Sequence, residues 1–314
     1  MVLQRACLIP LLLSIGSSAQ IPQPSRSEPA GPQKGAVAPA HSREFWQGVI
    51  HHDFTPPDGV SVADLSNELS GLLGSPDPEL RDETAYTVFV SWIYQKRLIG
   101  PDALLALAEQ WISNLQYEIG TPPSDAVFRR SFSALALSVA VARDNDAPVL
   151  DAAAFRRILT AALEYLHSEQ DLRGYDPIKG WIHSAAHTAD LLKFLGRSRY
   201  LDPADQRAIL DGIGAKMAAA TVVFTHGEDE RLARAVLSLI NRPDADREGF
   251  RAWLTQIRPK RLTAPLPAVE ELRASQNVKN LLSKLEVVLS VDPKPSDGAK
   301  TALEDVRKAL TALF

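Results

Sequence analysis

The apolar residues of this chain recur at intervals of three and four positions almost everywhere from Arg43 onward, and this spacing constrains the fold most strongly. The clearest example is the segment Leu104–Leu115, whose large apolar residues lie at positions 104, 105, 107, 111, 112 and 115. Residues with that spacing share one face of an α-helix. The alternation of apolar and polar residues that is typical of β-strands is absent. The sequence therefore predicts an all-α fold.

Helix-start signals support the helices that this spacing predicts. Asp77-Pro78 and Asp202-Pro203 each place a capping carboxylate before a proline, which is favoured at the first helical position. Most connections are short, so successive helices are expected to run antiparallel. The predicted helices span Arg43–His51, Val62–Leu73, Pro78–Lys96, Pro101–Tyr117, Ala126–Arg143, Ala152–Ser168, Trp181–Leu195, Pro203–Ala220, Glu228–Ile240, Arg247–Gln256, Val269–Leu289 and Asp297–Leu313.

An array of antiparallel helix pairs has two plausible architectures in this chain. The segment Leu72–Ala85, an Asp/Pro turn followed by an arginine at a helix start, resembles the junction of a HEAT-type repeat. Helix starts also recur at intervals of roughly 50 residues, near Pro78, Ala126, Trp181 and Glu228. Both a HEAT-like α-solenoid and a closed α/α toroid fit this pattern.

The domain boundaries follow from changes in composition. Residues 42–257 are predicted to form the helical-repeat domain. Residues 258–314 are predicted to form a basic, proline-rich linker and a C-terminal helical hairpin. We expect the hairpin to cap the end of the array, because two isolated helices bury too little apolar surface to be stable alone.

The N-terminal residues have the pattern of an exported protein. Residues 1–19 contain Arg5, an apolar run from Ala6 to Ile15 and small residues before Gln20, as a secretory signal peptide does. Residues 20–41 are rich in Pro, Ser, Gly and Ala, and are predicted to form a disordered tether. The expected location is periplasmic or extracellular.

Composition argues against several functional classes. The net charge is −4 without a basic stripe, so nucleic acid is not an expected partner. The only cysteine, Cys7, lies in the predicted signal, so no disulfide, cysteine nucleophile or thiolate metal site is expected after cleavage. The apolar run of the signal is shorter than the roughly 20 residues that span a bilayer. No stable membrane insertion is therefore expected once the signal is removed.

Two histidines and an aspartate fall on one face of the predicted helix that begins at Trp181. His183, His187 and Asp190 lie within about 60° of one another around such a helix. This arrangement can bind a divalent metal through His183 and His187, or can supply a catalytic general base and its orienting partner. The alternative is a structural polar stripe whose side chains hydrogen-bond to neighbouring helices.

Further candidate ligand-binding residues lie before this helix and at other helix starts. The loop Glu169–Gly180 is the longest in the array, and long loops often bind ligands. Charged residues at helix starts have structural alternatives, namely favourable interaction with the helix dipole or salt bridges between repeats. Because alternate helices begin on the same edge, these groups are expected to converge there. The candidates are Arg130, Arg173, Tyr175, Trp181, Glu228, Asp229 and Arg231.

Three motifs resemble a known family when they are taken together. They are Arg81-Asp82-Glu83-x-Ala85-Tyr86, Gly180-Trp181-x-His183-x-x-Ala186-His187-x-Ala189-Asp190-Leu191-Leu192 and Glu228-Asp229-Glu230-Arg231-Leu232-Ala233. The chain resembles, over about Leu65 to Ile240, the bacterial family catalogued as domain of unknown function 2785. The resemblance implies a bacterial source and a helical-repeat fold, and it implies no activity or catalytic residue.

Two functions remain open from the sequence. The first is an exported helical scaffold that binds an unidentified ligand or protein partner along its polar edge. The second is a metal-assisted hydrolase, in which a divalent metal at His183, His187 and a carboxylate from Asp190 or from the Glu228–Glu230 cluster activates water. A carboxylate within coordinating distance of both imidazoles would favour the enzyme. Imidazoles that are hydrogen-bonded to backbone carbonyl groups, with no cavity beside them, would favour the scaffold.

Overall fold

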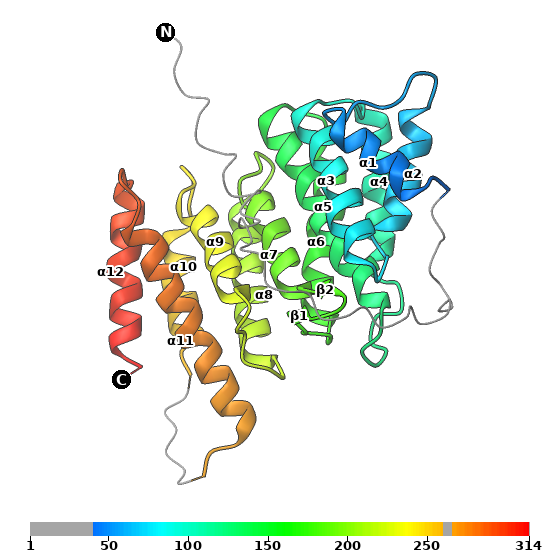
Figure 1. Ribbon diagram of the computed structural model, residues 1–314. Coiled ribbons are helices and arrows are strands. Elements are labelled where there is room, and N and C mark those ends of the chain that lie inside the picture. Colours follow the sequence, from blue (N-terminus) through cyan, green and yellow to red (C-terminus); the bar gives the residue numbers. More distant parts are fainter. Residues whose placement is uncertain (1–39, 260–265, 314) are drawn as a thin grey trace. The chain divides into compact units, whose positions relative to one another are not determined.

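The computed structural model of the chain describes residues 40–259 and 266–313 (Figure 1). The predicted signal peptide, nearly all of the predicted tether and part of the predicted linker lie outside the described residues. The described residues are mainly helical with one small hairpin, so the all-α prediction is confirmed. The helices are α1 (Arg43–His51), α2 (Val62–Leu72), α3 (Thr87–Phe89), α4 (Pro101–Asn114), α5 (Ala126–Asp146), α6 (Ala152–Ser168), α7 (Ser184–Leu195), α8 (Pro203–Ala219), α9 (Glu228–Ile240), α10 (Arg247–Gln256), α11 (Val269–Ser290) and α12 (Asp297–Thr311), with π-helical stretches η1 (Glu79–Tyr86) and η2 (Val90–Gln95) and strands β1 (Tyr175–Asp176) and β2 (Gly180–Trp181).

The helices pack in two adjoining rows. The first row runs from η2 through α5, α7 and α9 to α11, each helix packing against the next. The second row contains α2, α4, α6, α8 and α10 in that order. Contacts of α4 with α5, α6 with α7, and α8 with α11 join the rows. Helices that are close in sequence are therefore close in space, as in repeat proteins.

Helix α5 lies at the centre of the core. Nearly all its side chains from Val127 to Ala142 are buried, so it lacks the polar face that α9 and α10 retain. Small residues such as Ala134 on α5 and Ala185 and Ala189 on α7 are buried where these two helices pack together. Small side chains let two helix backbones approach closely, which accounts for the long contact between α5 and α7.

The segment predicted as one α-helix over Pro78–Lys96 is helical but is wound more widely than expected. The backbone N–H of Thr87 donates to the carbonyl of Asp82, five residues earlier, and Lys96 donates to Ser91 in the same way. Hydrogen bonds of this span define a π-helix, which is rare and is frequent at functional sites. Periodicity alone does not distinguish the two helix types.

The helix predicted to begin at Trp181 begins three residues later, at Ser184. Tyr175 and Asp176 pair antiparallel with Trp181 and Gly180 in a two-stranded hairpin. His183 is the N-cap residue of α7 and has a left-handed backbone conformation, with φ at 48°. The prediction that His183 lies within the helix was wrong, because the backbone N–H groups of residues 182 and 183 donate to the loop carbonyls of residues 173 and 174.

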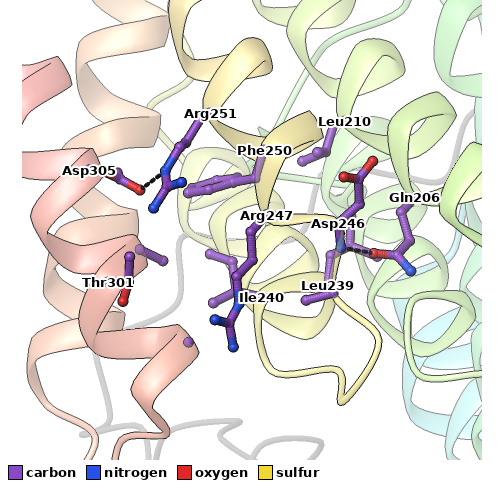
Figure 2. Close-up of a pocket in the computed structure, with 13 residues that line it drawn as sticks. Gln206, Leu210, Leu239, Ile240, Asp246, Arg247, Phe250, Arg251, Thr301 and Asp305 are labelled. Carbon is purple, nitrogen blue, oxygen red and sulfur yellow. Dashed lines mark hydrogen bonds and ion pairs between the residues drawn. The ribbon is translucent and has the colours of Figure 1, made fainter.

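The C-terminal helices pack against the rest of the array. Helix α11 contacts α9 and α8, while α12 contacts α10 and α11. Figure 2 shows Phe250 and Arg251 of α10 facing α12, where Arg251 bonds Asp305 at 2.8 Å. A cavity of about 30 Å³ lies there, lined in part by Phe250, Arg251 and Asp305. In the described part of the chain, no helix combines the length and apolar character needed to cross a bilayer.

Candidate functional site

The β1–β2 hairpin is anchored to the helices by the fully buried Arg81 and by an ion pair between Lys179 and Asp125. The Arg81 guanidinium donates to the carbonyls of Lys179 at 2.7 Å, Trp181 at 3.3 Å and Ser75 at 2.9 Å. The Lys179 ammonium donates to both carboxylate oxygens of Asp125 at 2.7 and 2.8 Å. Residues from η1 and from the start of α5 therefore hold the hairpin in place.

A chain of aromatic rings leads from the core to this hairpin. The rings of Phe132 and His187 meet edge to face at 4.7 Å, and His187 meets His183 at 5.8 Å. The His183 ring stacks flat on Trp181 at 4.2 Å with an interplanar angle of 21°. Trp181 in turn meets Tyr175 at 4.8 Å. The buried imidazole of His183 thus covers one face of the Trp181 indole ring and holds it in place.

The outer end of this chain is open to solvent. The exposed fractions of Tyr175, Ile178 and Trp181 are 49%, 80% and 43%. The Asp176 carboxylate accepts the backbone N–H groups of Ile178 and Lys179, each at 2.8 Å, and so fixes the turn. We call the exposed side chains of Tyr175, Ile178 and Trp181 the hairpin platform. Large apolar groups gathered on a rigid surface are typical of binding sites.

His183 is held as a neutral imidazole. Its Nε2 lies 3.0 Å from the carbonyl oxygen of His226, which can only accept, so Nε2 carries the proton. Burial, aided by the Arg231 charge, lowers the pKa of His183 to about 4. The Glu228 carboxylate is 3.8 Å from Nε2, too far for a hydrogen bond, and does not keep the ring protonated.

His187 is also neutral and is bonded within the core. Its Nδ1 lies 2.8 Å from the Ser131 hydroxyl, and that hydroxyl donates to the carbonyl of Ile182 at 2.5 Å. Because a hydroxyl has one proton, Nδ1 donates to Ser131. Burial, together with the neighbouring His183, holds the pKa of His187 well below its usual range.

Asp190 is directed toward cations rather than toward the two histidines. Its carboxylate accepts from Lys193 at 2.8 Å and from Arg231 in a short ion pair. Burial acts to raise the pKa of Asp190, but Lys193 and Arg231 outweigh it, and the pKa is lowered. Asp190 is therefore an ionised acceptor beside the site.

Two residues of η1 complete the polar surroundings of the platform. Asp82 accepts from Arg81 at 2.7 Å, yet burial raises the pKa of Asp82 to about 6. Burial also raises the pKa of Tyr86, and the Asp190 carboxylate adds to this effect while Arg231 opposes it. One electrostatic group therefore contains Asp82, Tyr86, Asp190 and Arg231. We call this group the charged cluster.

Arg130 lies apart from these groups. Its guanidinium donates to both oxygens of Glu169 at 2.6 and 3.0 Å and to the carbonyl of Tyr117 at 2.9 Å. The residue is only 2% exposed. A ligand cannot reach it without unfolding, so the structure gives Arg130 a structural role.

The remaining candidates mainly order the backbone. Arg173 bonds the Asp171 carboxylate at 2.5 and 2.8 Å and so orders the loop before the hairpin. Glu228 accepts the backbone N–H of His226 at 2.8 Å, and Asp229 accepts that of Glu230 at 2.8 Å. Both acids are buried at the start of α9, as the helix-dipole alternative predicts.

The predicted metal ligands do not form a ligand set with a third residue. Among the described residues, no three His, Cys, Asp or Glu side chains are placed to hold a metal ion together. The Nε2 of His183 already donates to a carbonyl, and Asp190 faces Arg231. The imidazole of His183 is bonded to a backbone carbonyl, as the scaffold alternative requires, whereas that of His187 is bonded to the Ser131 hydroxyl.

Sequence reasoning missed Asp82, Tyr86 and Ile178 as members of the site. Asp82 and Tyr86 lie one helical turn apart in the first motif of the family resemblance, and that spacing was the available signal. Three helix starts meet at the hairpin: η1 reaches it through Arg81, α5 through Asp125, and the residue before α9 reaches His183. Arg130, which was expected among them, lies apart and is paired with Glu169.

Comparison with protein families identifies a domain that contains the hairpin platform and both histidines. Residues 115–287 match the family described as Protein of unknown function (DUF2785). The chain belongs to this family. The match begins after Arg81 and Asp82 and includes most of α11, so the family segment starts and ends later than the predicted span from Leu65 to Ile240. Comparisons of this DUF2785 protein with curated proteins and with solved structures gave no match.

Proposed function

We propose that this DUF2785 protein is an exported binding protein whose ligand site is the hairpin platform together with the charged cluster. One observation carries the proposal: exposed Trp181 is stacked on buried His183, and its backbone is bonded to buried Arg81. The fold uses buried polar groups to immobilise an aromatic ring that itself faces solvent. Such pre-organisation lowers the entropic cost of binding.

The charge on Asp82 supports the same site. A carboxyl whose pKa is raised to about 6 by burial opposes folding when it is ionised. Residues that reduce stability in this way cluster at functional sites. We infer that Asp82 serves the ligand rather than the fold.

The proposed scaffold is a HEAT-like array. In the described residues, the strong contacts run between neighbours within each row and between facing helices of the two rows. Repeat proteins have this nearest-neighbour pattern and commonly bind partners along one edge. We therefore favour the HEAT-like α-solenoid over the closed toroid. Export rests on the signal-like segment before Gln20.

The metal-assisted hydrolase has less support. Its two histidines are neutral and hydrogen-bonded to Ser131 and to the carbonyl of His226. Of its proposed carboxylates, Asp190 is paired with Arg231, and Glu228 accepts the backbone N–H of His226. A metal would have to displace at least one of these bonds. The binding protein requires no such rearrangement.

Thermal unfolding with fractionated envelope and extracellular extracts tests the proposal. A fraction that contains the ligand raises the melting temperature of the wild type and does not raise that of Trp181→Ala. Leu98→Ala is the matched control, because Leu98 is similarly exposed, at 41%, and lies outside the site. It is expected to respond as the wild type does. A fraction that stabilises wild type and Trp181→Ala equally, or the absence of any active fraction, contradicts the proposal.

A further inference from the structure

We infer that the ligand of the hairpin platform is a neutral carbohydrate whose sugar ring stacks on the outer face of Trp181. The inference rests on the proposed function, because it names the chemical class that the same site recognises. Three features of the site carry it: the orientation of the indole ring, the pairing of the charged groups around it, and its size.

The orientation of Trp181 suits a flat apolar ligand face. One face of the indole is covered by His183 at 4.2 Å, and the Tyr175 ring meets the indole at an angle of 65° with the ring centroids 4.8 Å apart. The residue nevertheless stays 43% exposed. The C–H groups on one side of a pyranose ring form a flat apolar surface, and a fixed aromatic ring stacks on it with little loss of freedom.

The charged groups beside the platform are already paired with one another. Asp82 is paired with Arg81, and Asp190 is paired with Lys193 and Arg231. An ionic ligand would have to compete with these ion pairs. A neutral polyol would not, because its hydroxyl groups can donate to carboxylate oxygens and accept from a guanidinium in addition to the existing pairs.

Part of this polar group is open to solvent. The side chains of Arg231 and Asp82 are 38% and 27% exposed, and Asp190 is 13% exposed. Arg81 links the two parts of the site directly, because the same nitrogen donates to the Asp82 carboxylate and to the Trp181 carbonyl. Arg81 therefore joins the backbone of Trp181 to a carboxylate of the charged cluster, toward which the proposed ligand extends.

The size of the platform favours a small ligand over a folded protein. A stable protein interface buries about 800 Å² on each partner. The platform offers three exposed apolar side chains, Tyr175, Ile178 and Trp181, and its surroundings are charged. Three side chains provide enough apolar surface to contact one or two sugar rings, but too little for a protein interface of that size.

Isothermal titration of the full chain with cellotetraose, maltotetraose and tetra-N-acetylchitotetraose, after a screen on an array of neutral and anionic glycans, tests the inference. At least one neutral glycan is expected to bind the wild type, and Trp181→Ala is expected to weaken it about tenfold or more. Trp181→Phe keeps an aromatic ring and should lose less. Leu98→Ala should bind as the wild type does, and circular dichroism melts show whether each variant is folded.

Three results overturn the inference. They are the absence of glycan binding by the wild type, equal binding by folded Trp181→Ala, and binding of anionic glycans alone. If no glycan binds but an extract fraction still stabilises the wild type and not Trp181→Ala, the proposed function stands and the carbohydrate class is wrong.

Discussion

Arg81 and Arg130 are both buried arginines near the starts of long helices, yet their surroundings differ. Arg130 meets Glu169 through two hydrogen bonds, and both side chains are shielded from solvent. Arg81 bonds backbone carbonyls and one oxygen of Asp82, whose side chain is 27% exposed, and the Nε of Arg81 has no hydrogen-bond partner. The first region is a closed ion pair, whereas the second holds a surface hairpin.

The difference separates stability from function. Glu169 also accepts the backbone N–H of Asp171 through its side chain, and its carbonyl accepts from buried Lys216 at 2.8 Å, so Glu169 finds all these partners inside the fold. The region of Arg81 leaves a carboxyl whose ionised form is unfavourable. A site that must meet a ligand keeps polar groups that the fold alone does not need.

The largest expected effect is on the closed pair. Glu169→Ala leaves the buried Arg130 charge without its partner and is expected to lower the free energy of unfolding by about 3–5 kcal/mol. Urea unfolding measures the change. A loss below about 1 kcal/mol would show that water reaches Arg130, and it would remove the contrast between the two regions.

The second prediction concerns acid and the histidines of the hairpin region. The pKa of His183 is about 4 in the fold, against about 6.5 in the unfolded chain. The unfolded chain therefore takes up the proton first, and stability falls as pH is lowered from about 6.5 to about 4, by about 3 kcal/mol in total. Above this window the histidine has no such effect.

Asp82 acts in the opposite direction within that window. Because the pKa of Asp82 is raised, the stability that this group contributes is present below about pH 3.8 and is lost as the pH rises through about 6. The loss of stability as the pH is lowered should therefore be shallower in His183→Gln, and steeper in Asp82→Asn, than in the wild type. Melting temperatures measured from pH 7.5 to 4 test this. Parallel profiles for all three proteins would contradict the assignment.

A third prediction tests how closely the hairpin sits against α9. A Cβ added at Gly174 would lie 2.5 Å from the His226 ring and 2.8 Å from a Glu228 oxygen. Gly174→Ala is therefore expected to cost about 1–3 kcal/mol. Gly48→Ala is the control, because no atom lies within 4 Å of the added Cβ in helix α1. It should be neutral or stabilising by up to about 1 kcal/mol. Equal results for the two variants would mean that the hairpin moves freely.

The smallest expected effect has the opposite sign to the first. Asp82→Asn removes a charge that burial disfavours, and at pH 7 it should raise the free energy of unfolding by about 1 kcal/mol, allowing for partial exposure to solvent. Urea unfolding beside Glu169→Ala gives the comparison directly. A loss similar to that of Glu169→Ala would make Asp82 a structural partner of Arg81.

Much of the helical framework could be predicted from the sequence. The observed bounds of α1, α9 and α10 are the predicted ones, because apolar spacing and caps act within a few residues. Alternating helix directions also predicted that helix starts meet on one edge, which holds for Arg81, Asp125 and His226 but not for Arg130.

The candidate site could be predicted only in part. His183 and His187 are neighbours as expected, since they lie one turn apart. Their partners were not foreseen. Ser131 lies 56 residues before His187, and His226 lies 43 residues after His183.

The sequence by itself determined that this chain is helical, where most of its helices begin, and that two histidines lie one turn apart at the start of α7. Only the tertiary structure decided which of these groups face solvent. Arg81 reaches the carbonyl of Trp181 across 100 residues, and Arg231 rather than a histidine takes Asp190. Hydrogen bonds and burial between distant segments leave no periodic pattern in the sequence. They decide that the indole of Trp181 faces solvent and that the charge of Asp82 is unfavourable.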